Sequence, residues 1–486
     1  MDFVIRDASV IDGSGAAPQT MDVGIEQGRL RLGPNLSANQ VIDGNGLTLT
    51  PGFIDVHTHD DFAAVIYPDM NFKVSGGVTS CVVGNCGMGA APFAAAQTFA
   101  GALHPNKHLP PWDGYAGYLQ LLEEQPPSVN IGALVGHGTV RLSVMNNDRR
   151  EPTQAELGRM KRLVEEGLDA GALGFSSGLV YDPGRFAATE ELIELAATMG
   201  GRGGLYATHM RDEGVGLLDS IDEAIAIGQR AGVAVQISHH KASGKPAWGL
   251  VKESLIKIEQ AQNEGFDIHA DQYPYTAGST ILSAIYRDGH LGGEREGLTA
   301  GDVVIASAQG HANWEGKSVQ ELSQEMQLTV PVTCETLLNA CPGITIILHT
   351  MQEDDVRLVM AHPSTMIGSD GLPTLDGKPH PRLYGTFARV LGHYCRDLGV
   401  FSLCEAVYRM TGFPAAKFGL NGRGVIADGA QADLVLFDAD RIVDKGTFSE
   451  PNQSPAGINR VWVNGILTII KGKHTGERAG KTLRLT

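Results

Sequence analysis

Short apolar runs alternate with helical patterns through the middle of the chain, between residues 52 and 368. Such alternation is typical of βα units, in which a helix follows each strand and packs on a parallel sheet. Eight runs have the length and composition of strands: 52–56, 79–83, 130–135, 172–175, 205–208, 233–238, 266–270 and 365–368. They predict an α/β fold, a (β/α)8 barrel with insertions. The alternative is an open doubly wound sheet, but no Gly-rich dinucleotide-binding turn opens the first βα unit.

Helices between these runs are signalled by caps and spacing. Thr153 and Glu156 have the spacing of a capping box, in which each side chain accepts a bond from the other residue's amide. Apolar residues then recur every three or four positions, as they do on the buried face of a helix. The same spacing predicts helices around 215–225 and 250–258.

Both ends of the chain read as short strands joined by turns. Asn45-Gly46 and Asn464-Gly465 are hairpin signals between apolar runs. We therefore expect residues 1–50 and 424–486 to pair into one small β-sandwich domain.

The barrel is expected to occupy residues 51–423. Between its seventh and eighth strands, residues 285–342 interrupt the βα rhythm and carry a helical pattern around 319–326. We expect this segment to be an insertion that covers the barrel mouth as a lid.

Composition limits the class of protein and its partners. The chain of 486 residues is 42% hydrophobic and 19% charged, which indicates a folded protein with a core. Its net charge of −17 argues against nucleic acid or an anionic membrane as partner, and no apolar run is long enough to span a bilayer. The six scattered cysteines do not form a disulfide framework, and the first residues carry no secretory signal, so a cytoplasmic location is expected.

Polar side chains gather where the predicted strands end. The first strand is followed by His57 and His59, the second by Cys86, the fifth by His209, the sixth by His239 and His240, and the eighth by Asp370. In a (β/α)8 barrel the carboxyl ends of the strands face the active site. Imidazole and thiolate groups suit zinc, so we predict a metal site at this end of the barrel. His269 and Asp271, near the end of the seventh strand, are candidates to support the ligands.

Two of these positions leave a choice between neighbours. Successive residues on a strand point to opposite faces, so only one of His239 and His240 faces the barrel mouth easily. Cys81 lies within a strand, where a buried structural thiol is expected. Cys86 lies in the following loop, where ligands belong.

Several motifs resemble those of a known family. The segment PGFIDVHTH at 51–59 resembles the opening signature of the amidohydrolase superfamily, and residues 424–437 resemble its ending. Other motifs are similar to those of the zinc-dependent D-aminoacylases, or N-acyl-D-amino-acid deacylases: GNCG at 84–87, GHGTVR at 136–141, GFSSGL at 174–179, THMR at 208–211, ISHHK at 237–241, YPY at 273–275, GSDGLP at 368–373 and HPR at 380–382. The motifs around Cys86 and His239 are the more specific ones.

The resemblance implies an enzyme that hydrolyses the amide bond of a small-molecule N-acyl-D-amino acid. It implies that Cys86, His209 and His239 hold one tightly bound Zn²⁺. It also implies a second, weaker metal site, formed by His57, His59 and Asp370. Asp370 matches the catalytic group that takes a proton from water and delivers it to the departing amine.

The resemblance further implies that Lys241, Tyr273 and Arg382 hold the α-carboxylate of the substrate, since cations bind carboxylates through charge-assisted hydrogen bonds. We expect such cations to make the site locally positive.

The preference for the D-residue's side chain depends on the stretch after 279–282. In the acidic-substrate branch of the family, an arginine near this stretch contacts the side-chain carboxylate. The register places Tyr286 at that position, with Arg287 beside it, and Met351 fits an apolar wall. We expect neutral or hydrophobic D-residues, with D-glutamate or D-aspartate as the alternative.

Two other functions remain open. A cyclic amidase of the hydantoinase or dihydroorotase type would have a bridging lysine near the fourth strand, and residues 172–178 contain none. A non-catalytic barrel used for protein interaction would be expected to lose its metal ligands, whereas this chain keeps the full set.

Overall fold

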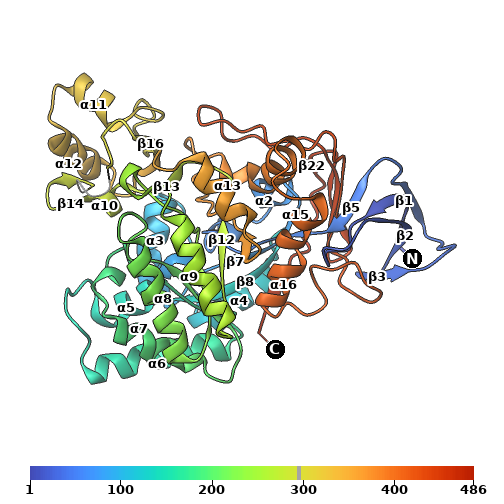
Figure 1. Cartoon of the computed structure of the whole chain (residues 1–486), viewed down its shortest axis with the longest axis horizontal. Helices are drawn as coiled ribbons and strands as arrows, with labels where there is room; N and C mark the ends of the chain where they lie inside the picture. The colour runs from blue at the N-terminus through green and yellow to red at the C-terminus, as the bar shows by residue number, and fades with distance from the viewer. Residues whose placement is uncertain (293–296, 486) are drawn as a thin grey trace.

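The computed structural model describes residues 1–292 and 297–485. Residues 293–296 of the predicted insertion and residue 486 of the predicted β-domain lie outside the described part. Figure 1 shows a barrel surrounded by helices, a strand-rich body at one end and a smaller body at the opposite corner.

Eight parallel strands form the barrel sheet in the order β6 to β12, followed by β18. Their bounds are β6 Phe53–Asp55, β7 Val78–Val83, β8 Asn130–Gly136, β9 Gly174–Gly178, β10 Leu205–His209, β11 Ala234–Ile237, β12 Ile268–Gln272 and β18 Thr365–Ile367. Every predicted barrel strand overlaps one of these, and the prediction of a (β/α)8 barrel is confirmed.

Two strands begin later than their apolar runs suggested, β9 at Gly174 and β12 at Ile268. The amide of Ala172 donates a hydrogen bond to the carbonyl of Gly167, and the amide of Phe266 donates one to the carbonyl of Ala261. The first apolar residues of both runs therefore lie in the turn that closes the preceding helix, α6 or α9. β12 continues into polar residues, of which Asp271 contacts His57 and His239.

Residues just beyond β6 and β18 complete the ring. The amide of Asp370 donates to the carbonyl of His57 at 2.7 Å, and the amide of His59 donates to Gly371 at 3.1 Å. The closure of the barrel thus brings predicted site residues from opposite ends of the sheet side by side.

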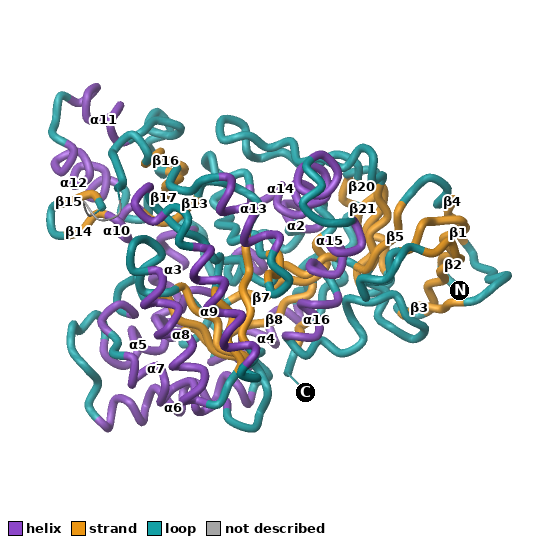
Figure 2. The backbone as a smooth tube through the Cα atoms, in the orientation of Figure 1, coloured by secondary structure: helices purple, strands orange, loops and turns teal. Residues whose placement is uncertain are grey.

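Helices surround the barrel sheet, as the purple coils around the orange strands in Figure 2 show. They are α1 Ala63–Ile66, α2 Asn71–Val74, α3 Phe93–Leu103, α4 Gly114–Glu124, α5 His137–Met145, α6 Gln154–Asp169, α7 Thr189–Ala196, α8 Leu217–Ala231, α9 Val251–Asn263, α13 Glu353–Ala361, α14 Arg382–Arg389, α15 Leu403–Met410 and α16 Gly412–Lys417. The three helices predicted from spacing correspond to α6, α8 and α9, and the capping box of Thr153 and Glu156 begins α6.

Strands from both ends of the chain share one further sheet. It contains β1 Phe3–Val10, β2 Gln19–Glu26, β3 Arg29–Leu32, β4 Gln40–Asp43, β5 Thr48–Pro51, β19 Leu434–Phe437, β20 Ile458–Val463, β21 Ile466–Ile470 and β22 Lys473–His474. β5 pairs antiparallel with β19 and so joins the two ends. The chain then returns to the barrel, where β23 Thr482–Leu483 pairs with β8.

The segment between β12 and β18 forms a small body of its own. β13 Gly278–Ile281, β17 Thr345–Leu348 and β16 Val303–Ser307 make a three-stranded sheet, and β14 Tyr286–Arg287 pairs with β15 His290–Leu291. The helices α10 Leu282–Ile285, α11 Val319–Met326 and α12 Val330–Ala340 belong to it. It has a separate apolar core that includes Ile305, Trp314 and Leu337.

Over the described residues, no helix combines the length and the apolar character needed to cross a membrane.

Candidate metal centre

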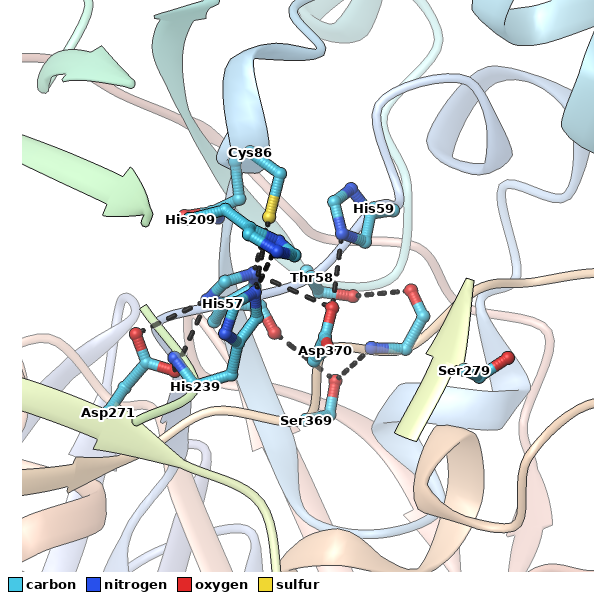
Figure 3. Close-up of polar contacts among 12 residues, drawn as sticks. His57, Thr58, His59, Cys86, His209, His239, Asp271, Ser279, Ser369 and Asp370 are labelled. Carbon is cyan, nitrogen blue, oxygen red and sulfur yellow. Dashed lines mark hydrogen bonds and ion pairs between the residues drawn. The ribbon is translucent and has the colours of Figure 1, made fainter. Parts of the chain in front are cut away.

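Cys86, His209 and His239 lie on different barrel segments, and their side chains meet (Figure 3). The sulfur of Cys86 is 3.6 Å from Nε2 of His239, which is 2.9 Å from Nδ1 of His209. One donor atom from each residue lies within 4.8 Å of the other two, and all three residues are buried. This arrangement offers two nitrogens and one sulfur to a single ion.

His57, His59 and Asp370 lie against this group. Nε2 of His59 is 3.1 Å from Oδ1 of Asp370, and Nε2 of His57 is 3.5 Å from the same oxygen. Nε2 of His57 is also 3.4 Å from the sulfur of Cys86. The structure therefore brings all six sequence-predicted ligands into one cluster, with Cys86 at its centre.

The donor set fits zinc, which prefers neutral imidazole and thiolate ligands. Burial opposes ionisation of the Cys86 thiol, but His57, His209 and His239 outweigh burial and hold the pKa of Cys86 well below its usual value. The lowered pKa favours the thiolate form of the sulfur, which is the form that metals bind.

Three of the six predicted ligands have left-handed backbones. The φ angles are 53° at Cys86, 36° at His239 and 48° at Asp370. Residues other than glycine rarely adopt this region, and where they do the strain tends to mark functional sites. The loop of Cys86 also needs Gly178, because a Cβ there would lie 2.1 Å from the carbonyl oxygen of Cys86.

Asp271 supports both halves of the cluster, as its position near the end of β12 suggested. Its carboxylate is 3.2 Å from Nδ1 of His57 and accepts a hydrogen bond from the amide of His239 at 2.9 Å. Such partners orient metal ligands. His269 instead lies 3.7 Å from Asp267.

His240 points away from the cluster. Its Nε2 is 2.8 Å from the hydroxyl of Ser254, and burial lowers the pKa of His240 to about 3. His239 lies just beyond β11 in a left-handed conformation, so the chain turns between His239 and His240 and their side chains separate.

Glu213 contacts the cluster, although no motif singled it out. Its Oε1 is 2.8 Å from Nδ1 of His239 and 2.7 Å from Nζ of Lys241, and its Oε2 is 3.6 Å from Nε2 of His209. The only sequence signal is its position four residues after His209, in a loop whose path the sequence does not reveal.

Lys73 is a second residue that the sequence did not reveal. Its buried ammonium donates to Asp55 at 2.7 Å, to Thr58 at 2.8 Å and to Ser369 at 2.7 Å, and lies 3.3 Å from Asp60. Burial lowers the pKa of Lys73, but Asp55 and Asp60 outweigh burial and raise it. Through Thr58 and Ser369, Lys73 connects the segment that contains His57 and His59 to the segment that contains Asp370.

Lys73→Met is expected to lower the free energy of unfolding by about 3–5 kcal/mol, because it leaves Asp55 and Asp60 buried without their cation. Urea denaturation of the purified protein measures the change. Lys257→Met is the matched control, since Lys257 forms a surface pair with Asp222 at 2.8 Å and should change stability by at most about 1 kcal/mol. Equal losses in the two variants would contradict a special role for the buried ammonium.

A cavity of 350 Å³, the mouth cavity, opens beside the metal ligands. His209, His239 and Asp370 line it, together with Lys241 and Tyr273. Lys241 lies 5.9 Å from the centre of the Tyr273 ring, and both residues are predicted carboxylate-binding groups. The cavity therefore places three of the six predicted ligands and two predicted binding groups on one surface.

Arg382, the third predicted carboxylate-binding group, lies behind this surface with its side chain fully buried. Its Nη2 is 2.9 Å from Oδ2 of Asp370, and its guanidinium lies 4.4 Å from the centre of the Tyr273 ring. Within the described part of the chain, its Nε and Nη1 atoms and the hydroxyl of Tyr273 have no hydrogen-bond partner.

The three residues predicted to contact the substrate side chain are placed differently. Arg287 lines the mouth cavity, where its guanidinium donates to the carbonyl of Val180. Tyr286 is not among the lining residues that the structure describes, and its hydroxyl donates to Glu335 at 3.0 Å. The expected register placed Tyr286 at the substrate side chain, and this is wrong. Tyr286 and Arg287 are neighbours on β14 and point to opposite sides, so Arg287 faces the mouth cavity and Tyr286 does not. Met351 packs with Tyr273 behind the cavity surface.

The charge of the side chains that line the mouth cavity is mixed, so the side chains alone do not make the site locally positive. Its described lining contains Arg211, Lys241 and Arg287, but also Asp212, Glu213 and Asp370. The cations are balanced because Glu213 contacts Lys241 directly, and Arg211 pairs at 2.9 Å with Glu223, which lies outside the lining.

Comparison with known proteins agrees with this geometry. The model of the amidohydrolase family matches residues 40–280 and 253–469. A D-aminoacylase of Alcaligenes xylosoxydans xylosoxydans is 40% identical over 489 residues, covering 100% of this chain and 98% of the relative.

Two solved structures are similar over the whole chain. An N-acyl-D-glutamate deacylase from Bordetella bronchiseptica, complexed with zinc and a phosphonate inhibitor, is 36% identical with a TM-score of 0.90, covering 100% of this chain and 99% of that one. A D-aminoacylase described for its binuclear metal center is 39% identical with a TM-score of 0.89, covering 99% of both chains. The chain therefore belongs to the amidohydrolase family, in its D-aminoacylase group, and is a hydrolase.

Proposed function

We propose that this enzyme hydrolyses N-acyl-D-amino acids to a carboxylate and a free D-amino acid. The observation that carries the proposal is the buried group of Cys86, His209 and His239, whose two histidines line a cavity together with Asp370 and Lys241. The similarity to proteins named D-aminoacylase and N-acyl-D-glutamate deacylase supports the same substrate class.

The proposed cofactor is Zn²⁺, held tightly by Cys86, His209 and His239. His57, His59 and Asp370 would form a second, weaker metal site, and the relative described for its binuclear center supports this possibility. When bound, Zn²⁺ acts as a Lewis acid that polarises an amide carbonyl and makes water more acidic.

Asp370 is the proposed proton carrier of the reaction. Burial opposes its ionisation, but Arg382 and His239 outweigh burial and hold the pKa of Asp370 well below its usual value. The ionised carboxylate can accept a proton from the attacking water through Oδ1 and deliver it to the departing amine. Arg382 holds the other carboxylate oxygen, Oδ2, and so keeps Oδ1 directed at the histidines.

Lys241, Tyr273 and Arg382 are the proposed binding groups for the substrate α-carboxylate. Lys241 and Tyr273 line the mouth cavity, and the unpartnered nitrogens of Arg382 lie next to the Tyr273 ring. A planar guanidinium beside an ammonium can bind both oxygens of a carboxylate.

For the side chain of the D-residue, Ile285, Leu298 and Leu348 in the cavity wall support a neutral or hydrophobic group. Arg287 in the same wall supports D-glutamate or D-aspartate as the second candidate. A comparison of kcat/KM for N-acetyl-D-methionine and N-acetyl-D-glutamate distinguishes them.

We also propose that residues 1–50 with 424–486 act as the β-domain, that 51–423 act as the barrel and that 285–342 act as its lid. The net charge of −17 supports a small-molecule partner rather than nucleic acid or membrane. The six scattered cysteines, too few for a disulfide framework, support a cytoplasmic setting.

The proposed function predicts that the zinc-loaded enzyme releases free D-methionine from N-acetyl-D-methionine. The kcat/KM for the L-enantiomer should be at least about 10²-fold lower, because the groups that bind the α-carboxylate hold the substrate in one orientation at the metal. Chiral chromatography of the products measures both rates. Hydantoin is the control substrate, and its hydrolysis at a comparable rate would favour a cyclic amidase instead.

A further inference from the structure

A second, larger cavity lies next to the mouth cavity. This side cavity has a volume of 710 Å³, and it shares Tyr181, Ala284 and Arg287 with the mouth cavity. It opens between the α3 helix and the small body that contains β13 to β17. Neither the carboxylate-binding groups nor the ligand cluster contributes to its wall.

A narrow space of 30 Å³, the passage, connects the side cavity to the reacting groups. His59 and Asp370 line the passage at one end, and Met88 and Phe99 line both the passage and the side cavity. Tyr181 lines all three spaces. The passage is far smaller than the cavities of 350 and 710 Å³ on either side, so a single chain of methylene groups fits the route better than a bulky group.

The wall of the side cavity is mostly apolar. Its apolar side chains include Met88, Phe99, Ala102, Leu142, Ile281 and Pro342. Of its described lining residues, only Asp182 and Arg287 are charged, and Asp182 forms an ion pair with Arg185. An aliphatic group would lose water there without leaving a buried charge unpaired.

Tyr181 separates the two cavities in a defined position. Its hydroxyl is 3.1 Å from Oγ1 of Thr280, and its ring lies 5.0 Å from that of His209 in an edge-on arrangement. When the amide of a substrate lies at the metal ligands, its acyl group and its amino-acid part can therefore occupy the spaces on the two sides of the Tyr181 ring.

We propose that the side cavity binds the acyl chain of the substrate, and that this chain is an unbranched aliphatic group of about eight carbons rather than acetyl. The inference rests on the proposed function, because that function places the α-carboxylate at Lys241 and the scissile carbonyl beside Asp370. The acyl chain begins at that carbonyl, and the passage is the route from there that avoids the carboxylate-binding groups.

The test compares N-acetyl-D-methionine, N-butanoyl-D-methionine and N-octanoyl-D-methionine with the zinc-loaded full-length enzyme. A fully buried methylene raises affinity about threefold to fourfold, so kcat/KM should rise at least about tenfold from acetyl to octanoyl even in a partly open cavity. A flat or falling series, with clear hydrolysis of the acetyl substrate, would overturn the acyl site and leave the proposed function intact. Hydrolysis of none of the three would overturn both.

Ala102→Phe tests the location, because Ala102 lines both the passage and the side cavity. It should lower the octanoyl-to-acetyl ratio of kcat/KM about tenfold. Ala94→Phe, on the exposed face of the same helix and outside the described lining of all three spaces, should keep the wild-type ratio. Thr98→Trp, at an exposed position in the wall of the side cavity, gives a second variant in case Ala102→Phe fails to fold.

The amino-acid side chain is the competing occupant of the side cavity. If Ala102→Phe or Thr98→Trp left the octanoyl-to-acetyl ratio unchanged but selectively slowed N-acetyl-D-norleucine relative to N-acetyl-D-alanine, the D-residue's side chain would occupy this space and the acyl assignment would be wrong.

Discussion

Asp370→Asn is expected to lower kcat for N-acetyl-D-methionine by about 10²–10⁴-fold, the usual contribution of a positioned proton carrier. The amide has nearly the same shape as the carboxylate but cannot accept the proton of the attacking water. Zinc should stay at about one ion per chain, since Cys86, His209 and His239 remain. Steady-state kinetics and elemental analysis of the same preparation measure the two quantities.

The matched control is Asp376→Asn, because the side chain of Asp376 is 84% exposed and pairs only loosely with Lys107 at 3.7 Å. It should keep wild-type kcat and zinc content. Wild-type turnover by Asp370→Asn would remove Asp370 from its proposed role, whatever the zinc content.

Cys86→Ala is expected to lose the tightly bound zinc and, with it, nearly all activity. The sulfur lies 3.4 Å from His57 and 3.6 Å from His239, so its removal takes away the donor shared by both groups of ligands. Two neutral imidazoles alone bind zinc far more weakly than a set that includes a thiolate. Zinc per chain after dialysis, and kcat after zinc is added back, are the two measurements.

Cys404→Ala is the control for Cys86→Ala, because Cys404 is a half-buried thiol on α15, outside the ligand groups that the structure describes. It should retain both zinc and activity. Full zinc occupancy in dialysed Cys86→Ala would show that the ion has other ligands.

Much of the ligand set was predictable because it follows local rules. Each predicted ligand lies at the end of a barrel strand or within four residues beyond it, and all strands of such a barrel end on the same face. The expectation that only one of His239 and His240 faces the barrel mouth agrees with their different contacts, although a left-handed turn at His239, and not strand alternation, separates the two side chains.

Other residues near the centre could not be predicted because their contacts depend on the register between distant segments. Lys73 and Glu213 look like ordinary surface residues in the sequence, yet each contacts residues near the ligand cluster. At β14, a shift of one residue in the register decides whether Tyr286 or Arg287 faces the mouth cavity. The local sequence pattern does not distinguish two registers that differ by one residue.

By itself, the sequence determined the order of the barrel strands, the barrel and the chemical types of the side chains proposed as metal ligands, because hydrophobic periodicity and residue chemistry are local properties. Only the tertiary structure decided which side chains meet: the closure that places His57 beside Asp370, the ion pair of Asp370 with Arg382, and the side cavity beyond Tyr181. The contact of His57 with Asp370 joins residues more than three hundred positions apart, the pair of Asp370 with Arg382 joins a loop to the start of α14, and the side cavity forms from the walls of several elements at once. They exist only after barrel closure sets the relative positions of those elements.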